Sequence, residues 1–173
     1  KNTVFSNASG LPPRTLGIDA EHHSSAYDIA VLSRHAVRVP HLIELVSTHE
    51  YTMRPETTGK PHLYTLNDLL DRVLGSGRRY GYPGLDGIKT GMTSEAGFCL
   101  AATAERDGMR LISVVLGAPT KDARSKDTRT LLDYGFRTYE PVTIARPGEP
   151  LGEAVVSWGK EEKVSVSTVE ELT

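Results

Sequence analysis

The chain has 173 residues, of which 38% are apolar and 24% charged, with 20 lysines and arginines against 22 aspartates and glutamates. This length fits one domain of ordinary size or part of a domain with a small module, and a net charge of −2 leaves no excess of cations to coat a nucleic acid. No apolar run approaches the ~18 residues of a membrane-spanning helix, and the single cysteine excludes an intramolecular disulfide and a multi-thiolate zinc site.

Two helices are expected in the first part of the chain. Ser24 and Ser25 are candidate N-caps, and Asp28 follows in the first turn, where a carboxylate favours the positive end of the helix dipole. Apolar residues continue from there at helical spacing. Pro40 suits the first position of a helix, so a second, short helix is expected from Pro40 through Leu45.

The middle of the chain changes from loop to strand. Residues 58–84 are rich in glycine and proline and predict mostly loop, with one helical turn over residues 67–70. Three strands are expected to follow, and the Asp-Gly pair within residues 105–108 fits a hairpin turn between the last two. The expected strands cover residues 87–90, 98–104 and 110–116.

A last long helix is expected over residues 122–139. Its predicted inner face consists of Thr128, Leu131, Leu132, Gly135, Phe136 and Tyr139. Helices that precede and follow an antiparallel hairpin predict an α/β (α+β) fold, with helices packed on a sheet.

The composition changes near Glu140-Pro141. Residues 146–150 read as a turn, and residues 164–167 alternate at the period of two that is typical of a half-buried strand. We therefore predict one domain over residues 1–140 and the start of a small β-rich domain over residues 141–173.

The stretch that points most clearly to chemistry is residues 86–98, Asp-Gly-Ile-Lys-Thr-Gly-Met-Thr-Ser-Glu-Ala-Gly-Phe. In a strand, Lys89 and Gly91 face one side and Thr90 the other. A fixed cation then lies beside backbone without a Cβ, which a ligand can approach closely. The Thr90 hydroxyl can hold a carboxylate, and the adjacent main chain can pair with an extended peptide as an added strand. These residue types favour a site for the acidic end of a peptide.

Lys-Thr-Gly has two other interpretations. The tripeptide arises by chance in roughly 4% of chains of this length, and it would then merely end a strand in solvent. A phosphate-binding loop needs Gly-Lys-Thr contiguous at the mouth of a helix, whereas Ile88 separates Gly87 from Lys89 here.

The histidines lack the spacing of a metal motif, so we expect no metal and no cofactor.

Together with other segments, residues 86–98 resemble the low-molecular-mass penicillin-binding proteins, the serine D-alanyl-D-alanine carboxypeptidases. The similarity runs in order from about residue 2 to residue 139. It includes Asn7-Ala-Ser-Gly-Leu-Pro, His23-Ser-Ser-Ala-Tyr-Asp-Ile-Ala-Val-Leu-Ser-Arg, Arg110-Leu-Ile-Ser-Val-Val-Leu-Gly-Ala-Pro and Leu131-Leu-Asp-Tyr-Gly-Phe. The resemblance implies the penicillin-binding and β-lactamase-like transpeptidase fold, incomplete here, followed by the small β-rich domain.

The resemblance also implies a reaction. In this family a serine attacks the bond between the two terminal D-alanines of a peptidoglycan stem peptide. D-alanine leaves, and water then releases the acyl-enzyme. Penicillin mimics the dipeptide and leaves a long-lived acyl-enzyme. Three motifs build the site: Ser-x-x-Lys, Ser-x-Asn and Lys-Thr-Gly.

The third motif is matched by Lys89, Thr90 and Gly91. By this resemblance Lys89 helps to hold the second motif and sets the potential of the site, Thr90 binds the terminal carboxylate, and Gly91 keeps the strand open. The backbone N–H of Met92 is expected to be one of two oxyanion donors, a contribution often worth ~3 kcal/mol. Arg124 matches a family arginine that adds positive charge for the substrate.

The other two motifs are missing from the 173 residues. Neither Ser-x-Asn nor Tyr-x-Asn occurs, and the one Ser-x-x-Lys, Ser157-Trp158-Gly159-Lys160, follows Lys-Thr-Gly and carries a glycine that disfavours a helix. We interpret this match as coincidence. Because the chain begins at Lys1 rather than Met, we expect a C-terminal portion of a longer carboxypeptidase, inactive by itself.

The alternative hypothesis is a non-catalytic module that binds D-Ala-D-Ala or peptidoglycan, or that serves as a scaffold. For the carboxypeptidase, the resemblance implies stem peptides ending in D-Ala-D-Ala and β-lactam antibiotics as partners, with no nucleic acid. It also implies an extracytoplasmic, secreted location, with any membrane anchor outside this chain.

Overall fold

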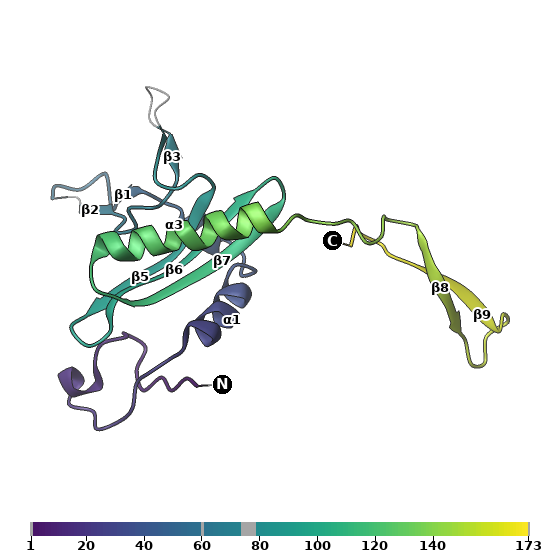
Figure 1. Cartoon of the computed structure of the whole chain (residues 1–173), viewed down its shortest axis with the longest axis horizontal. Coiled ribbons are helices and arrows are strands. Elements are labelled where there is room, and N and C mark those ends of the chain that lie inside the picture. Colours follow the sequence, from purple (N-terminus) through teal and green to yellow (C-terminus); the bar gives the residue numbers. More distant parts are fainter. Residues whose placement is uncertain (1, 60, 74–78, 173) are drawn as a thin grey trace. The chain divides into compact units, whose positions relative to one another are not determined.

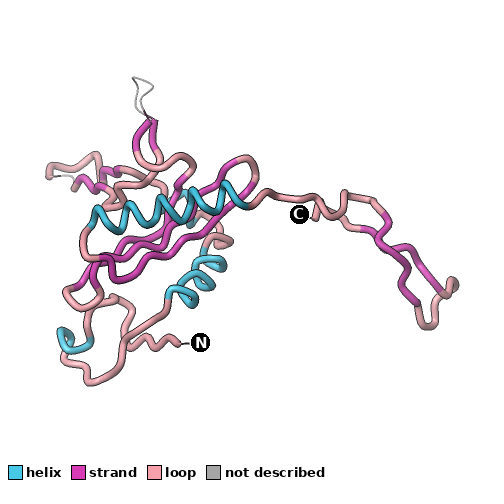
Figure 2. Tube along the Cα trace, in the orientation of Figure 1, coloured by secondary structure: helices cyan, strands magenta, loops and turns pink. Residues whose placement is uncertain are grey.

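A computed structural model describes residues 2–59, 61–73 and 79–172. Its contacts divide the chain into two compact units, Lys1–Thr138 and Tyr139–Thr173. The division falls close to the change of composition at Glu140-Pro141, although the assignment of these units to two named domains stays a prediction. Figures 1 and 2 show the elements of each unit.

The first unit is built on an antiparallel sheet in the order β5-β6-β7. The three strands are β5 (Leu85–Thr93), β6 (Gly97–Arg106) and β7 (Met109–Ala118), so the three expected strands are confirmed and each is longer than predicted. Asp107 and Gly108 form the turn between β6 and β7 with φ values of +49° and +80°. Two successive positive φ values are typical of the tight hairpin turn that Asp-Gly predicts.

Helices cover both faces of this sheet. The long helix α3 (Lys121–Thr138) packs on β6 and β7 (Figure 1), whereas α2 (Leu42–Val46) packs on β5 and α1 (Ala26–Ala36) mainly on β7. A Cβ on Gly135 of α3 would meet Leu111, and a Cβ on Gly87 would meet Val46 of α2. Leu111 pairs with Ala104 and Gly87 with Thr103. Because neighbouring residues of a strand face opposite sides, α3 and α2 lie on opposite faces.

The amino-terminal helices differ in how well the sequence predicts them. Ser25 is the N-cap of α1, and its hydroxyl oxygen accepts a hydrogen bond from the Asp28 N–H at 3.1 Å, as expected. The prediction for the second helix is wrong at its start, because Pro40 lies outside it. His41 has a φ of +64°, a left-handed conformation that interrupts the helical path, and α2 begins only at Leu42. A short 3-10 helix, η1 (Pro13–Leu16), lies nearer the amino terminus.

The segment predicted as mostly loop contains short strands. Strand β2 (His62–Tyr64) pairs with β1 (Glu50–Thr52), and β3 (Arg72–Val73) pairs with β4 (Arg79–Tyr80). Strands of two or three residues are too short to give a periodic pattern, so the sequence did not reveal them. The expected turn over residues 67–70 is present, with a hydrogen bond of 3.2 Å from Leu70 N–H to the Asn67 carbonyl. Residues 60 and 74–78 lie outside the described residues.

The core lies between the sheet and α3. Its buried members are Leu69, Leu70, Tyr82, Leu85, Leu100, Ala102, Ala104 and Leu132. On α3 the predicted inner face is confirmed at Thr128, Leu132 and Gly135. It is wrong at Leu131, which is 47% exposed because it lies about 100° around the helix from Leu132, and at Tyr139, which follows the end of the helix.

Tyr82 anchors one end of this core. Its hydroxyl donates a hydrogen bond to Asp133 Oδ1 at 2.7 Å, and the Arg106 guanidinium lies 4.4 Å from its ring centre. Burial, together with the hydrogen bond to the Asp133 carboxylate, raises the pKa of Tyr82 to about 12. In the unfolded chain the tyrosine pKa is about 10.

The raised pKa of Tyr82 predicts a loss of stability in alkali. The protonated hydroxyl stabilises the fold fully below about pH 10, and this contribution is lost as pH rises from about 10 towards 12. We expect Tyr82→Phe to cost about 1 kcal/mol at pH 8 through the lost hydrogen bond and to weaken the alkaline loss. Urea denaturation at pH 8 and pH 11 measures both, with the exposed Tyr27→Phe as a control that changes neither.

The second unit contains one hairpin. Strand β8 (Pro150–Val155) pairs with β9 (Lys163–Ser167), which confirms the strand expected over residues 164–167. The loop between them holds Ser157-Trp158-Gly159-Lys160, and Trp158 is fully exposed with a φ of +68°. The Ser-x-x-Lys match therefore does not lie on a helix, where one turn would bring the serine and lysine together.

Candidate functional site

Strand β5 presents Lys89, Thr90 and Gly91 at an edge of the sheet. Within the described parts of the chain, β5 pairs with β6 alone, so its other edge has no strand beside it. Its partner is well defined, with Lys89 opposite Ala101 and Thr90 opposite Leu100. Such an edge offers backbone N–H and C=O groups to an extended peptide.

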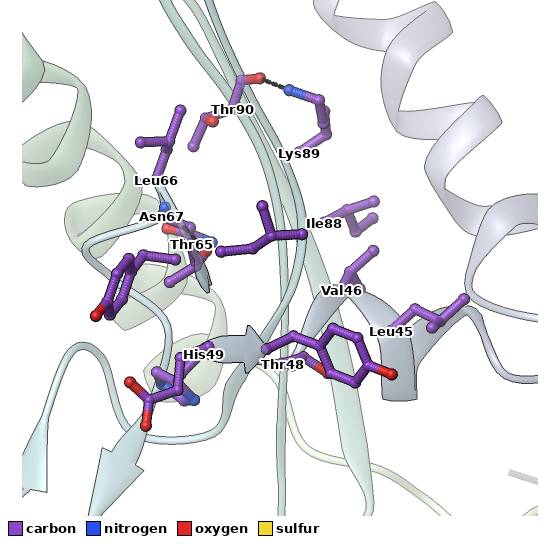
Figure 3. A pocket seen from close by; sticks show the side chains of 14 residues that line it. Leu45, Val46, Thr48, His49, Thr65, Leu66, Asn67, Ile88, Lys89 and Thr90 are labelled. Carbon is purple, nitrogen blue, oxygen red and sulfur yellow. Dashed lines mark hydrogen bonds between the residues drawn. The ribbon is translucent and has the colours of Figure 1, made fainter. Parts of the chain in front are cut away.

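A cavity of about 340 Å³ lies along this edge. Residues from α2, the link to β1, β1, β2 and the loop after β2 line it together with β5. They include Val46, His49, Leu66, Asn67, Lys89 and Thr90. Figure 3 shows these side chains around the cavity, with Thr90 near Leu66 and Asn67 on one side of the strand. The motif is therefore positioned beside a space of the size that ligands occupy.

The three motif residues have different surroundings. The Lys89 ammonium donates to the carbonyl oxygen of Thr90 (Figure 3), and the lysine is exposed whereas Thr90 is half-buried. Gly91 lies opposite Cys99, and a Cβ on Gly91 would find its nearest neighbour, the Cys99 Cβ, at 3.9 Å. Gly91 thus leaves space beside the strand without being required by the fold, and Met92 follows it with 63% of its surface exposed.

Arg124 lies in the first turn of α3, where its side chain is only 4% exposed. Its guanidinium donates a hydrogen bond to Asp68 Oδ1 at 2.8 Å. The Nε atom is buried and has no hydrogen-bond partner in the part of the chain that is described. Arg124 is therefore a buried, paired cation in this structure, and its role in substrate binding stays a prediction.

Sequence reasoning missed a clamp that positions the start of β5. Arg110 on β7 reaches across β6 and donates to both carboxylate oxygens of Asp86 at 2.9 Å, and to Thr103 Oγ1 at 3.0 Å. It also pairs with Glu105, and these hydrogen bonds, led by the one to Asp86, raise the pKa of Arg110. Asp86 stands at the head of the motif, but nothing in the spacing identifies Arg110 as its partner.

Among the residues that the structure describes, no cluster of three histidine, cysteine or acidic side chains is arranged to hold a metal ion. No described helix has the length and apolar character needed to span a membrane.

Comparisons with known proteins agree with the geometry. Residues 1–120 match the family model described as D-alanyl-D-alanine carboxypeptidase. The chain is 32% identical over its whole length to the D-alanyl-D-alanine carboxypeptidase DacF of Bacillus subtilis, covering 41% of that protein. It thus spans less than half the length of this relative.

Solved structures give the same result. Penicillin-binding protein 5 from Haemophilus influenzae is 31% identical with a TM-score of 0.73, over 99% of this chain and 45% of that one. Penicillin-binding protein D2 from Listeria monocytogenes, in its ampicillin-bound form, is 40% identical with a TM-score of 0.61, over 78% of this chain and 49% of that one. The expected fold is confirmed, and the chain belongs to the D-alanyl-D-alanine carboxypeptidase family.

Proposed function

We propose that this chain carries the substrate-binding strand of a serine D-alanyl-D-alanine carboxypeptidase. The enzyme removes the terminal D-alanine from peptidoglycan stem peptides through an acyl-enzyme, and penicillin acylates the same serine. The observation that carries the proposal is the placement of Lys89, Thr90 and Gly91 on an edge strand beside a cavity. Membership of the family supports the chemistry.

Each residue of the strand has a role in this proposal. The peptide lies along β5, the Thr90 hydroxyl donates to its terminal carboxylate, and Lys89 supplies positive potential. The Met92 N–H donates to the oxyanion that forms when the serine attacks the scissile carbonyl, and a donor of this kind is worth about 3 kcal/mol. Gly91 leaves room for the peptide, and Arg124 adds a second cation for the carboxylate.

In this proposal the nucleophile lies in sequence outside these 173 residues, which contain no Ser-x-Asn and no Ser-x-x-Lys on a described helix. We expect a fluorescent penicillin to leave the 173-residue chain unlabelled and to label a longer protein that includes the upstream motifs. Gel fluorescence after denaturation measures the covalent adduct. Stable labelling of the 173 residues alone would contradict the proposal. If neither form is labelled, the result supports the alternative hypothesis, a non-catalytic module that binds D-Ala-D-Ala or serves as a scaffold.

Thr90→Val tests carboxylate recognition in the longer protein. Valine keeps the branched shape but loses the hydroxyl, so we expect kcat/KM for a peptide ending in D-Ala-D-Ala to fall by about 10- to 100-fold, the worth of a hydrogen bond to a charged group. Thr90→Ser retains the hydroxyl and should keep most of the activity. Equal activity in the valine and serine variants would remove Thr90 from the site, and a large loss of stability in Thr90→Val would make its role structural.

The proposal extends to location and domains. Peptidoglycan lies outside the cytoplasmic membrane, so the protein acts there, with stem peptides and β-lactams as its partners. We further propose that residues 1–140 belong to the peptidase domain and that residues 141–173 begin a small β-rich domain. The division of contacts after Thr138 supports this boundary.

A further inference from the structure

Asp68 and Arg124 join two parts of the first unit that are 56 residues apart in the sequence. Arg124 donates to Asp68 Oδ1 at 2.8 Å, and the hydroxyl of Ser125 donates to Asp68 Oδ2 at 3.0 Å. The Arg124 side chain is 4% exposed and that of Asp68 36%. A nearly buried cation is thus paired with a carboxylate that keeps partial access to solvent.

The Arg124 guanidinium has one N–H donor without an acceptor among the described residues. This donor is Nε, which is buried. A buried donor without a partner costs free energy, so an additional acceptor would be bound favourably. Asp68 directly follows Asn67, which lines the cavity beside Thr90. The wall of the proposed carboxylate site and the ion pair are thus adjacent along the chain, although neither Asp68 nor Arg124 itself lines the cavity.

We propose that Asp68 sets how strongly this site selects a ligand with a free carboxylate, by neutralising part of the charge of Arg124. The inference rests on the proposed function, in which Arg124 attracts the terminal carboxylate of the substrate. Two anions then share one guanidinium, and the charge of Asp68 weakens the attraction for the second. Asp68 acts through Arg124 and does not touch the ligand, so it is a residue that determines specificity and is not catalytic.

Asp68→Asn separates the charge from the contact. Asparagine keeps an oxygen that accepts from Arg124 and Ser125, while the negative charge disappears. The experiment measures acylation of the longer protein by benzylpenicillin and by its methyl ester, which carry the same reactive ring. The ratio of the two second-order rates reports recognition of the carboxylate. We expect Asp68→Asn to raise this ratio by about threefold to tenfold, as removal of one nearby charge predicts.

Three comparisons make the test specific. Asp122→Asn makes the same charge change on an exposed residue of α3 and should leave the ratio unchanged, because solvent screens it. Asp68→Glu keeps the charge and should behave as the wild type. The Lys121 ammonium also lies 4.0 Å from Asp68 Oδ1, but this lysine is half exposed and its charge is better screened. In an Arg124→Met background, Asp68→Asn should therefore lose most of its effect. Asp68→Ser is a second neutral variant if the asparagine variant folds poorly.

The outcomes distinguish a failure of this inference from a failure of the proposed function. An unchanged or lower ratio in a folded Asp68→Asn variant, an equal rise in Asp122→Asn, or a rise of the same size without Arg124 would overturn the inference while leaving the proposed function intact. Failure of both penicillins to acylate the wild-type protein would instead overturn the proposed function, and the inference with it.

Discussion

Gly84→Ala should destabilise the fold by about 3 kcal/mol or more. Gly84 has a φ of +81°, and a Cβ there would lie 2.3 Å from the carbonyl oxygen of Glu105. A left-handed backbone costs an L-residue roughly 1–2 kcal/mol, and overpacking against backbone adds about 1–3 kcal/mol. Neither group can move freely, because the Gly84 carbonyl accepts the Glu105 N–H at 3.0 Å.

Gly108→Ala is the matched control for this prediction. Gly108 has nearly the same φ, +80°, but a Cβ there would meet nothing within 4 Å. Its substitution should cost only the backbone preference, roughly 1–2 kcal/mol. Urea denaturation followed by circular dichroism measures both variants. Equal losses in the two variants would show that the contact with Glu105 relaxes and that only the backbone conformation matters.

Arg110→Met should cost about 3 kcal/mol and loosen the start of β5. The guanidinium makes two parallel hydrogen bonds of 2.9 Å to Asp86, and both side chains are about three-quarters buried. Removing one member of such a pair leaves the other charge partly buried without its partner, which costs about 3–5 kcal/mol when burial is complete. Hydrogen exchange of the β5 amides should become faster, since Asp86 is the second residue of that strand.

Glu105→Gln provides the comparison for the Arg110 clamp. Glu105 is the more exposed of the two acidic partners, at 47%, and its charge is better screened. Its substitution should cost less than about 1 kcal/mol, because the paired contacts between Arg110 and Asp86 remain. A loss as large as that of Arg110→Met would mean that Glu105, and not Asp86, is the partner that holds β5.

The sequence predicted well those features that depend on neighbouring residues. The three strands were expected close to where they lie, Asp107-Gly108 located the hairpin turn between the last two, and Ser25 located the start of α1. Each of these signals acts through residues within one turn or one strand of each other. The start of α2 was misplaced because Pro40 is equally suited to the turn that precedes a helix.

The candidate site was likewise predictable only where it depends on neighbouring residues. Lys89, Thr90 and Gly91 are contiguous, so the sequence could indicate a ligand-binding strand, and together with the other matching segments it led to the family. The cavity beside them could not be predicted, because its walls come from α2, the β1–β2 hairpin and β5, and their meeting depends on packing. The ion pair between Arg124 and Asp68 could not be predicted either. The sequence predicted that Arg124 is a cation available to the substrate and did not indicate Asp68 as its partner.

The resemblance of several segments in order was enough to predict the family, the strand that carries Lys-Thr-Gly, and the lack of the nucleophile motifs in these 173 residues. Folding alone brings Arg110 to Asp86 across 24 residues and Asp68 to Arg124 across 56. The reason is physical: local patterns fix backbone conformation and the face on which a side chain lies. The partner of a buried charge depends on strand register and helix packing, which are set by the whole core at once.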